Sequence, residues 1–307
     1  MNKEKIFITD VSPRDGLQNQ NQYVSTTDKY LLIQKLVNAG LKHIEVSSFV
    51  SPKAVPMLAD AMELVPKVLQ DFPEVDASVL IPNIKGVERA ITTGVKEVAL
   101  VLCATETMNQ KNINMSLDKA ISSSKEIIAL AKENKLRTKA YIGVAFDCPY
   151  EGRVSKETVL KLAREMYDEG VDQIVVADTI GSASPFLVRE RLAEVLQFIP
   201  QHQTVIHLHN TRGMALANAW AALDMGVRWF DASVGGIGGC PFAPGAAGNM
   251  ATEDLVLMAE QCGYSTGISL QKLVDAVQHA ENILNRNLGG GSLNWIKQNI
   301  TSLDTFF

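Results

Sequence analysis

Two histidines at alternate positions of one β-branched segment are placed to do metal chemistry. His207 and His209 stand in "TVIHLHN", residues 204–210. Because strand side chains alternate between faces, both imidazoles point the same way, roughly 6.6–7 Å apart along the strand. That spacing lets them bind one metal ion, whereas two satisfied histidines in a strand are the alternative. The neighbours Val205 and Leu208 are apolar, so an inward-facing pair needs a polar partner.

A cation and a carboxylate follow the first apolar segment of the chain. Arg14 and Asp15 lie between Pro13 and Gly16 in "SPRDGLQN", a pattern that predicts a turn. On its own this pair also fits an ordinary polar turn. Asp15 and the two imidazoles would make three ligands, and Asn249 in "GAAGNM" offers an amide oxygen as a fourth. Such a mixed set suits a catalytic Mg²⁺ or Mn²⁺ ion rather than a closed thiolate zinc site.

Two further carboxylates, Glu45 and Asp178, occupy strand-like segments. Glu45 stands between Ile44 and Val46, where a solvated charge is hard to explain. Asp178 ends the apolar run of "VVADTIG". Either could orient a ligand or pair with Arg14, and a structural ion pair inside the fold is the alternative.

Glycines surround one thiol. Residues 231–250, "DASVGGIGGCPFAPGAAGNM", hold six glycines, two prolines and Cys240. Because glycine permits positive φ and close approach of the backbone to a ligand, we predict a loop that closes over substrate and delivers the thiol. A buried cysteine acting as a small hydrophobe is the alternative. The glycines assigned to the flexible loop are Gly235, Gly236, Gly238 and Gly239.

Eight strand-like segments, alternating with helical patterns, would position these groups. The alternation predicts an α/β fold, a (β/α)₈ TIM barrel with additional C-terminal helices, and a doubly wound open sheet is the alternative. Reactive groups of such a barrel belong at the C-terminal ends of its strands. The strand segments are residues 6–11, 43–49, 75–81, 97–103, 138–146, 173–179, 204–210 and 229–234.

One catalytic domain accounts for residues 1–307. Since a barrel of this type needs about 250 residues, we expect the barrel over about 5–250 and C-terminal helices and tail over about 251–307. Helical patterns occupy residues 252–263 and 270–287, and residues 289–307 are expected to form a loosely packed tail.

Composition and charge limit the class of partner. The net charge of −5, without a long basic run, argues against nucleic acid or an anionic membrane as the main partner. Four widely spaced cysteines without a CxxC pair indicate a reducing compartment. The first ten residues leave no room for a targeting peptide, and no apolar stretch is long enough to span a membrane, so we expect a cytoplasmic protein.

Taken together, the motifs resemble those of the 3-hydroxy-3-methylglutaryl-CoA lyase family. The likeness runs from about residue 6 to about residue 285, and its glycine-rich "GGCP" loop is specific to that family. "PRDG" and the HxH strand are shared with a wider superfamily of metal-dependent barrels that make or break carbon–carbon bonds. The motifs that carry the likeness are "SPRDGLQN", "IEVSSFVSPKAVPMLAD", "KNIN", "CPYEG", "DTIG", "HLHNTRG", "SVGGIGGCPFAPGAAGN" and "ATEDLV".

The resemblance implies a retro-Claisen cleavage of 3-hydroxy-3-methylglutaryl-CoA to acetoacetate and acetyl-CoA, a step of leucine catabolism and ketone body metabolism. A divalent metal would lower the pKa of the tertiary hydroxyl, and Arg14 would stabilise charge on the thioester oxygen. Asp178 or a histidine such as His207 is the candidate base and Cys240 the candidate acid. The implied metal ligands are Asp15, His207, His209 and Asn249, with Glu45 in the acidic network and Glu253 supporting the site.

The chain departs from the family pattern after the histidine strand. It reads "NTRGM" where "DTYGQ" is common, which introduces Asn210, Arg212 and Met214. Arg212 could bind the substrate carboxylate or open room for another acyl group, so related 3-hydroxy-3-alkylglutaryl-CoA thioesters become candidate substrates. Residues proposed for the CoA side lie on a predicted loop after the fourth strand; they are Lys111, Asn112 and Asn114.

Alternative functions stay open at this point. They are an acetyl-CoA-dependent synthase that condenses a 2-oxoacid, a 4-hydroxy-2-oxoacid aldolase and a non-catalytic metal-binding barrel. We also expect a homo-oligomer, a dimer or higher.

Overall fold

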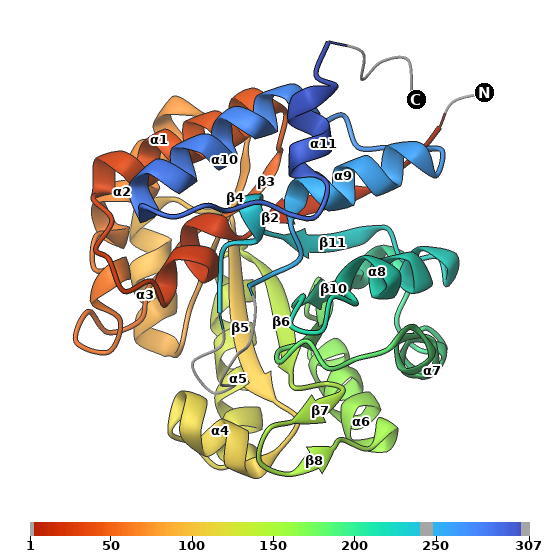
Figure 1. The fold of residues 1–307 in the computed structure, drawn as a ribbon. Coiled ribbons are helices and arrows are strands. Elements are labelled where there is room, and N and C mark those ends of the chain that lie inside the picture. The colour runs from red at the N-terminus through yellow and green to blue at the C-terminus, as the bar shows by residue number, and fades with distance from the viewer. Residues whose placement is uncertain (1–2, 240–247, 302–307) are drawn as a thin grey trace.

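Eight parallel strands close into a barrel in the order β10-β11-β2-β3-β4-β5-β6-β9. The computed structural model describes residues 3–239 and 248–301 (Figure 1). Every barrel strand overlaps one of the eight predicted segments, so the TIM barrel is confirmed and the open sheet is wrong. The strands are β2 (Phe7–Asp10), β3 (His43–Ser48), β4 (Asp76–Leu80), β5 (Glu97–Cys103), β6 (Arg137–Gly143), β9 (Gln173–Asp178), β10 (Thr204–Leu208) and β11 (Trp229–Ala232).

Helices cover the outside of the barrel. In the first of them, the Ser25 hydroxyl accepts a hydrogen bond from Asp28 N at the start, and Gly40, with φ of 105°, ends the helix. Leu32 and Leu36 of the same helix are buried against the barrel. These helices are α1 (Thr26–Ala39), α2 (Ala61–Asp71), α3 (Ile84–Thr93), α4 (Glu106–Ile113), α5 (Leu117–Glu133), α6 (Lys156–Asp168), α7 (Pro185–Val195) and α8 (Ala215–Asp224).

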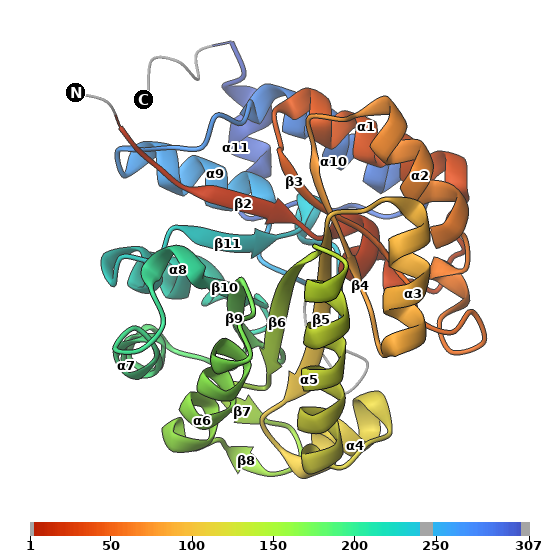
Figure 2. The ribbon, with the colours of Figure 1, turned by 180° about the vertical axis from the view of Figure 1, so that it is seen from behind.

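Three more helices follow the barrel in the described part of the chain; the first two were predicted, and the third lies in the expected tail. Both views show α10 lying beside α1, with α9 near the end of β2 (Figures 1 and 2). They are α9 (Thr252–Gln261), α10 (Leu270–Leu284) and α11 (Leu293–Gln298). Two short sheets complete the fold: β1 (Glu4–Lys5) pairs with β12 (Tyr264–Ser265), and β7 (Asp147–Cys148) pairs with β8 (Gly152–Arg153). Among the described residues, no helix is both long and apolar enough to cross a membrane.

The expected loose tail is wrong for its described part, residues 289–301. There α11 buries Leu293 and Ile296. The Asp254 carboxylate, at the start of α9, accepts hydrogen bonds from Gly291 N and Ser292 N, both 2.9 Å long. The segment is therefore part of the core packing rather than an appendage.

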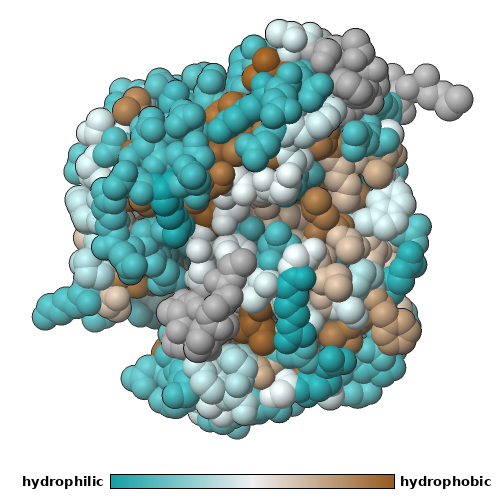
Figure 3. All heavy atoms as spheres, viewed as in Figure 1, coloured by the Kyte–Doolittle hydropathy of each residue, from teal (hydrophilic) through white to brown (hydrophobic). Residues whose placement is uncertain are grey.

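Exposed apolar side chains gather along α7 and α8. Phe186 is 77% exposed, and Trp220 and Met214 are each 44% exposed. Figure 3 shows apolar surface on the side where Figure 1 places these two helices. A groove lined mainly by apolar atoms lies next to Trp220, between α8 and α9.

Candidate metal centre and active site

A buried carboxylate positions the turn that carries Arg14 and Asp15. This turn, Ser12–Gly16, is a single π-helical turn directly after β2. Asp10, at the end of β2, accepts hydrogen bonds from Ser12 N (2.9 Å), Val234 N (3.1 Å) and Thr252 Oγ1 (2.7 Å). Burial raises the pKa of Asp10 to about 6 despite these bonds. The ends of β2 and β11 and the start of α9 are thereby held together at one mouth of the barrel.

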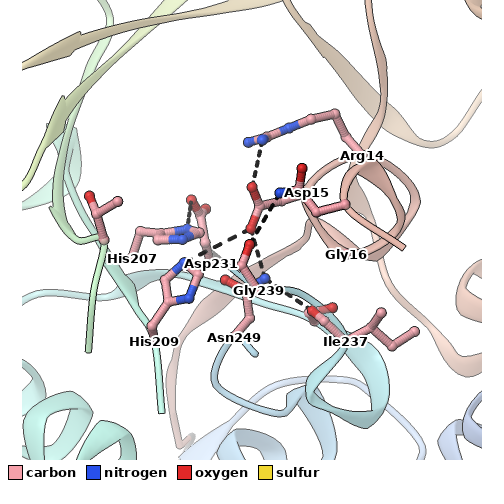
Figure 4. Close-up of polar contacts among 12 residues, drawn as sticks. Arg14, Asp15, Gly16, His207, His209, Asp231, Ile237, Gly239 and Asn249 are labelled. Carbon is pink, nitrogen blue, oxygen red and sulfur yellow. Dashed lines mark hydrogen bonds and ion pairs between the residues drawn. The ribbon is translucent and has the colours of Figure 1, made fainter. Parts of the chain in front are cut away.

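Asp15, His207 and His209 form a cluster suited to a metal ion. Their ligand atoms all lie within 4.8 Å of one another. Asp15 comes from the turn, His207 from β10 and His209 from the residues just after β10, with the two imidazole centroids 5.2 Å apart. Figure 4 shows all three side chains pointing toward one another. The sequence-based prediction of this triad agrees with their placement.

Asn249 has the geometry of a fourth ligand. Its Nδ2 donates hydrogen bonds to Asp15 Oδ2 (2.8 Å) and to Ile237 O (3.1 Å). Its Oδ1 is buried and accepts no hydrogen bond from any residue of the described ranges. A buried carbonyl oxygen beside a carboxylate and two imidazoles completes a donor set that Mg²⁺ or Mn²⁺ can accept. The residues present therefore fit a divalent metal ion.

Asp231, which the sequence-based prediction of ligands missed, orients His207. Its Oδ2 lies 3.2 Å from His207 Nδ1 and accepts a hydrogen bond of 2.6 Å from the Tyr141 hydroxyl. With Nδ1 held by a carboxylate, Nε2 carries the lone pair that a metal needs. Burial alone would lower the pKa of His207, but the bond to Asp231 and its charge raise that pKa overall. The signal was available, because Asp231 stands between Phe230 and Ala232 just as Glu45 stands between two aliphatic residues.

Arg14 is fixed by two carboxylates. Its Nε donates to Glu45 Oε2 and its Nη1 to Asp15 Oδ1, both at 2.6 Å. The predicted pairing of Glu45 with Arg14 is confirmed. Burial raises the pKa of Glu45 although Arg14 opposes the shift. For Asp15, burial is outweighed by Arg14 and the two histidines, so its pKa lies well below the usual range and it is ready to bind a cation.

Asp178 binds the loop that follows its own strand. Its two oxygens accept hydrogen bonds from Ser182 N (2.9 Å) and Ala183 N (3.0 Å). Burial raises its pKa to about 6. The next residue, Thr179, reaches the wall of the cavity described below.

The metal cluster forms part of the wall of a cavity of about 130 Å³. One side of the cavity is polar and carries Arg14 and the ligands, while Val101, Met108 and Ala177 make another side apolar. The complete lining is Arg14, Asp15, Gln18, Asn19, Val101, Met108, Asn112, Tyr141, Gly143, Ala177, Thr179, His207, His209 and Gly239.

The predicted loop after the fourth strand is wrong, because this segment forms α4. Lys111 and Asn112 lie within α4, and Asn114 ends it with a φ of 54°. Of the three, Asn112 lines the cavity, whereas the Lys111 ammonium lies 5.0 Å from the ring centre of Tyr150.

Arg212, one of the three departures from the family pattern, is exposed. Its Nη1 donates to Ser182 O at 3.3 Å. The Arg212 guanidinium therefore contacts the loop after β9, which Asp178 holds. Arg212 is not among the described residues that line the cavity.

The glycine-rich segment is described up to Gly239, and Cys240 lies outside the described residues. Gly235, Gly236 and Gly238 have φ of 65°, 64° and 146°, values that favour glycine. A Cβ on Gly238 would lie 2.5 Å from Asn249 Nδ2.

Glu253 ties this segment to the chain before α11. Its carboxylate accepts hydrogen bonds from Gly235 N (3.0 Å) and Gly290 N (2.7 Å). Burial raises the pKa of Glu253 to about 7. The side chain thus supports the backbone beside the site without contacting the ligand cluster among the described residues.

Comparison with known proteins assigns the chain to a family. The sequence profile of the HMGL-like family matches residues 5–279. The chain belongs to the HMGL-like family. This HMGL-like chain is 43% identical over 283 residues to mitochondrial hydroxymethylglutaryl-CoA lyase of Homo sapiens, which covers 92% of the chain and 87% of the human protein. It is 40% identical over 294 residues to hydroxymethylglutaryl-CoA lyase of Bacillus subtilis, covering 96% and 98%.

Solved structures of HMGL-like proteins share the fold. The hydroxymethylglutaryl-CoA lyase of Pseudomonas aeruginosa superposes with a TM-score of 0.92 at 38% identity, covering 97% of this chain and 100% of that one. An HMG-CoA lyase from Acinetobacter baumannii, solved with coenzyme A and 3-methylmalate, gives a TM-score of 0.90 at 38% identity and covers 94% of each chain.

Proposed function

We propose that this protein is a hydroxymethylglutaryl-CoA lyase that uses Mg²⁺ or Mn²⁺ to cleave 3-hydroxy-3-methylglutaryl-CoA into acetoacetate and acetyl-CoA. The observation that carries the proposal is the Asp15, His207 and His209 cluster, with the unpartnered amide oxygen of Asn249 beside it and Arg14 on the same cavity wall. The names of the human and Bacillus subtilis relatives support the substrate.

The reaction breaks the bond between C2 and C3 of the acyl group. The hydroxyl proton leaves, C3 becomes a ketone, and the bonding electrons move into a thioester enolate that then takes a proton at C2. A divalent ion held by the four ligands would lower the pKa of the hydroxyl. Arg14, fixed by Glu45 and Asp15, would donate hydrogen bonds to the enolate oxygen as its charge grows.

Two proton transfers complete the proposal. Asp178 or a histidine such as His207 is the proposed proton acceptor. His207 lines the cavity, whereas the Asp178 carboxylate accepts hydrogen bonds from Ser182 N and Ala183 N, and only its neighbour Thr179 lines the cavity. Cys240 is the proposed donor to C2. Its support is its position in the sequence directly after Gly239, which lines the cavity.

The acyl group, and not the whole thioester, matches the size of the cavity. Pockets that enclose complete drug-sized ligands are about 300–1,000 Å³, larger than the volume of about 130 Å³ here. The CoA portion would therefore lie outside the cavity, near α4, with Asn112 at the boundary and Lys111 and Asn114 on the outer side. The complex of the Acinetobacter baumannii relative with coenzyme A supports an acyl-CoA substrate.

The decisive experiment follows acetoacetate release from 3-hydroxy-3-methylglutaryl-CoA with Mg²⁺ or Mn²⁺, with and without a chelator. We expect turnover that the chelator abolishes and added metal restores. His209→Ala, which removes one ligand, should lose metal affinity and turnover while the barrel still folds. Absence of acetoacetate at saturating metal would reject the lyase, and assays for acetyl-CoA condensation and for pyruvate release would then test the synthase and the aldolase.

A separate experiment tests which 3-alkyl groups the enzyme accepts in its substrate. Turnover of the 3-methyl substrate and of a longer 3-alkyl analogue should both be detectable if related thioesters are accepted. Activity confined to the 3-methyl compound would remove that extension.

The proposal also covers the oligomeric state of the protein and its location in the cell. The exposed Phe186, Met214 and Trp220 along α7 and α8 support a homo-oligomer, a dimer or higher, which light scattering after gel filtration would measure. A cytoplasmic location is supported by the wide spacing of the four cysteines, which does not indicate a disulfide framework.

A further inference from the structure

The backbone of residues 235–239, which precedes Cys240, is fixed from several directions. At its start, Gly235 donates to the Glu253 carboxylate, and its carbonyl accepts a hydrogen bond of 3.0 Å from Gly289 N. Gly236 N donates 2.9 Å to Ser233 O. The beginning of the segment therefore belongs to the framework of β11 and α9.

The middle of the segment is attached to the metal centre. Ile237 O accepts a hydrogen bond from the same Asn249 nitrogen that donates to Asp15. The Ile237 side chain is fully buried, and a Cβ on Gly16 would lie 3.3 Å from Ile237 Cβ. The turn that bears Arg14 and Asp15 and the backbone at Ile237 thus pack as one unit.

The end of the segment has a different attachment. Asn19, three residues after the turn, donates from Nδ2 to Gly239 O at 3.2 Å. Asn19 and Gly239 both line the cavity that contains the metal cluster. No step of the mechanism above uses Asn19, yet its amide fixes the last described residue before Cys240.

We propose that Asn19 is a positioning residue of the reaction, which fixes the Gly239 backbone at the wall of the cavity. This inference rests on the proposed function. Asn249, a candidate metal ligand, holds the stretch at Ile237, and Asn19, which is not a candidate ligand, holds it at Gly239. Loss of the Asn19 amide should therefore loosen the backbone at Gly239 while Asp15, His207, His209 and Asn249 stay in place.

The test compares Asn19→Ala and Asn19→Asp with Asn21→Ala. Aspartate keeps the size of asparagine but removes the donor, and Asn21 is an exposed asparagine two residues further along. The measurements are kcat and KM for 3-hydroxy-3-methylglutaryl-CoA, the Kd of Mn²⁺ by calorimetry, the Tm, and amide hydrogen exchange of residues 235–239.

Both Asn19 variants should lower kcat by roughly fivefold to tenfold, the range expected for one hydrogen bond. The Kd of Mn²⁺ should stay within about twofold, because Asn19 contacts none of the ligands. Exchange at residues 235–239 should become faster, whereas Asn21→Ala should match the unmodified protein in every measurement.

Three results would overturn the inference: unchanged kcat in Asn19→Ala, unchanged exchange at residues 235–239, or losses of kcat, Mn²⁺ affinity and Tm that move together. The exchange measurement needs no substrate. If the unmodified protein failed to cleave 3-hydroxy-3-methylglutaryl-CoA, the proposed function would fall, and with it the catalytic role, while exchange would still show whether Asn19 holds Gly239.

Discussion

Asp231 orients the imidazole of His207, a candidate metal ligand, without being a candidate ligand itself. It is buried, and its Oδ2 binds both His207 Nδ1 and the Tyr141 hydroxyl. A carboxylate on the far nitrogen of a ligating imidazole fixes the tautomer and the direction of the ring. Metal affinity should therefore depend on a residue that does not contact the metal.

Asp231→Asn should weaken Mn²⁺ binding by about 10- to 100-fold, because the amide holds the imidazole less firmly. Tyr141→Phe keeps the carboxylate and should change the affinity less. Calorimetric titration of the metal-free proteins measures both. Equal affinities for Asp231→Asn and the unmodified protein would contradict the role given to Asp231.

Two neighbouring glycines should respond differently to the same substitution. The Cβ of Gly238→Ala would lie 2.5 Å from Asn249 Nδ2, so this change should reduce both metal affinity and turnover. A Cβ on Gly239 meets nothing within 4 Å among the described atoms, so Gly239→Ala should leave metal affinity within about twofold and act on turnover alone. Matched metal titrations decide the point, and identical behaviour of the two variants would refute it.

At the scale of elements, α11 converts an expected tail into part of the core. Ile296 is fully buried, while Asn294 on the same helix is exposed. Ile296→Ala should lower the free energy of unfolding by about 2–4 kcal/mol through lost burial and a residual cavity, and Asn294→Ala should change it by less than about 0.5 kcal/mol. Urea unfolding measures both. A change near zero for Ile296→Ala would contradict the packing of α11 into the core and would favour a loosely packed tail.

The strands could be predicted from sequence, whereas three of the helices, α2, α4 and α11, could not, for physical reasons. The last of these, α11, spans only six residues. Runs of β-branched residues mark a strand whose two faces are both covered, as in all eight barrel strands. In contrast, α4 reads "ETMNQKNI", in which Met108 and Asn109 are the buried residues, so it lacks the apolar period of a helix. In α2, Pro66 lies inside the helix and obscures the pattern.

The candidate site likewise contains residues that could be predicted from the sequence and contacts that could not. Residue types and spacing were sufficient to group Asp15, His207, His209 and Asn249 as candidate ligands, and the structure places these side chains together. The attachments of Asp231 to Tyr141 and of Asn19 to Gly239 join residues 90 and 220 positions apart. Such pairs follow from barrel closure, which a single sequence does not display.

At the scale of the whole molecule, buried acids should make stability depend on pH in an unusual direction. Burial raises the pKa of Asp10 and Asp178 from 3.8 to about 6 and that of Glu253 from 4.5 to about 7. Between about pH 4 and 7 the folded protein then holds more protons than the unfolded chain, so these groups lower the free energy of unfolding as the pH rises.

Urea unfolding of the metal-free protein should therefore show greater stability at pH 5.5 than at pH 7.5, by roughly 1–2 kcal/mol for each of these groups. Glu253→Gln cannot take up a proton and should make the profile shallower. A profile that is flat or rises over this interval would contradict the assignment of raised pKa values.

The contact between Asn249 and Asp15 joins residues 234 positions apart. During synthesis, the first metal ligand is made more than two hundred residues before the last, and the pairing of β11 with β2 must wait for nearly the whole barrel. A partly synthesised chain thus has an aspartate but no complete site. A divalent ion at this cluster would bind only the finished barrel, and it would thereby stabilise the closed ring relative to every open intermediate.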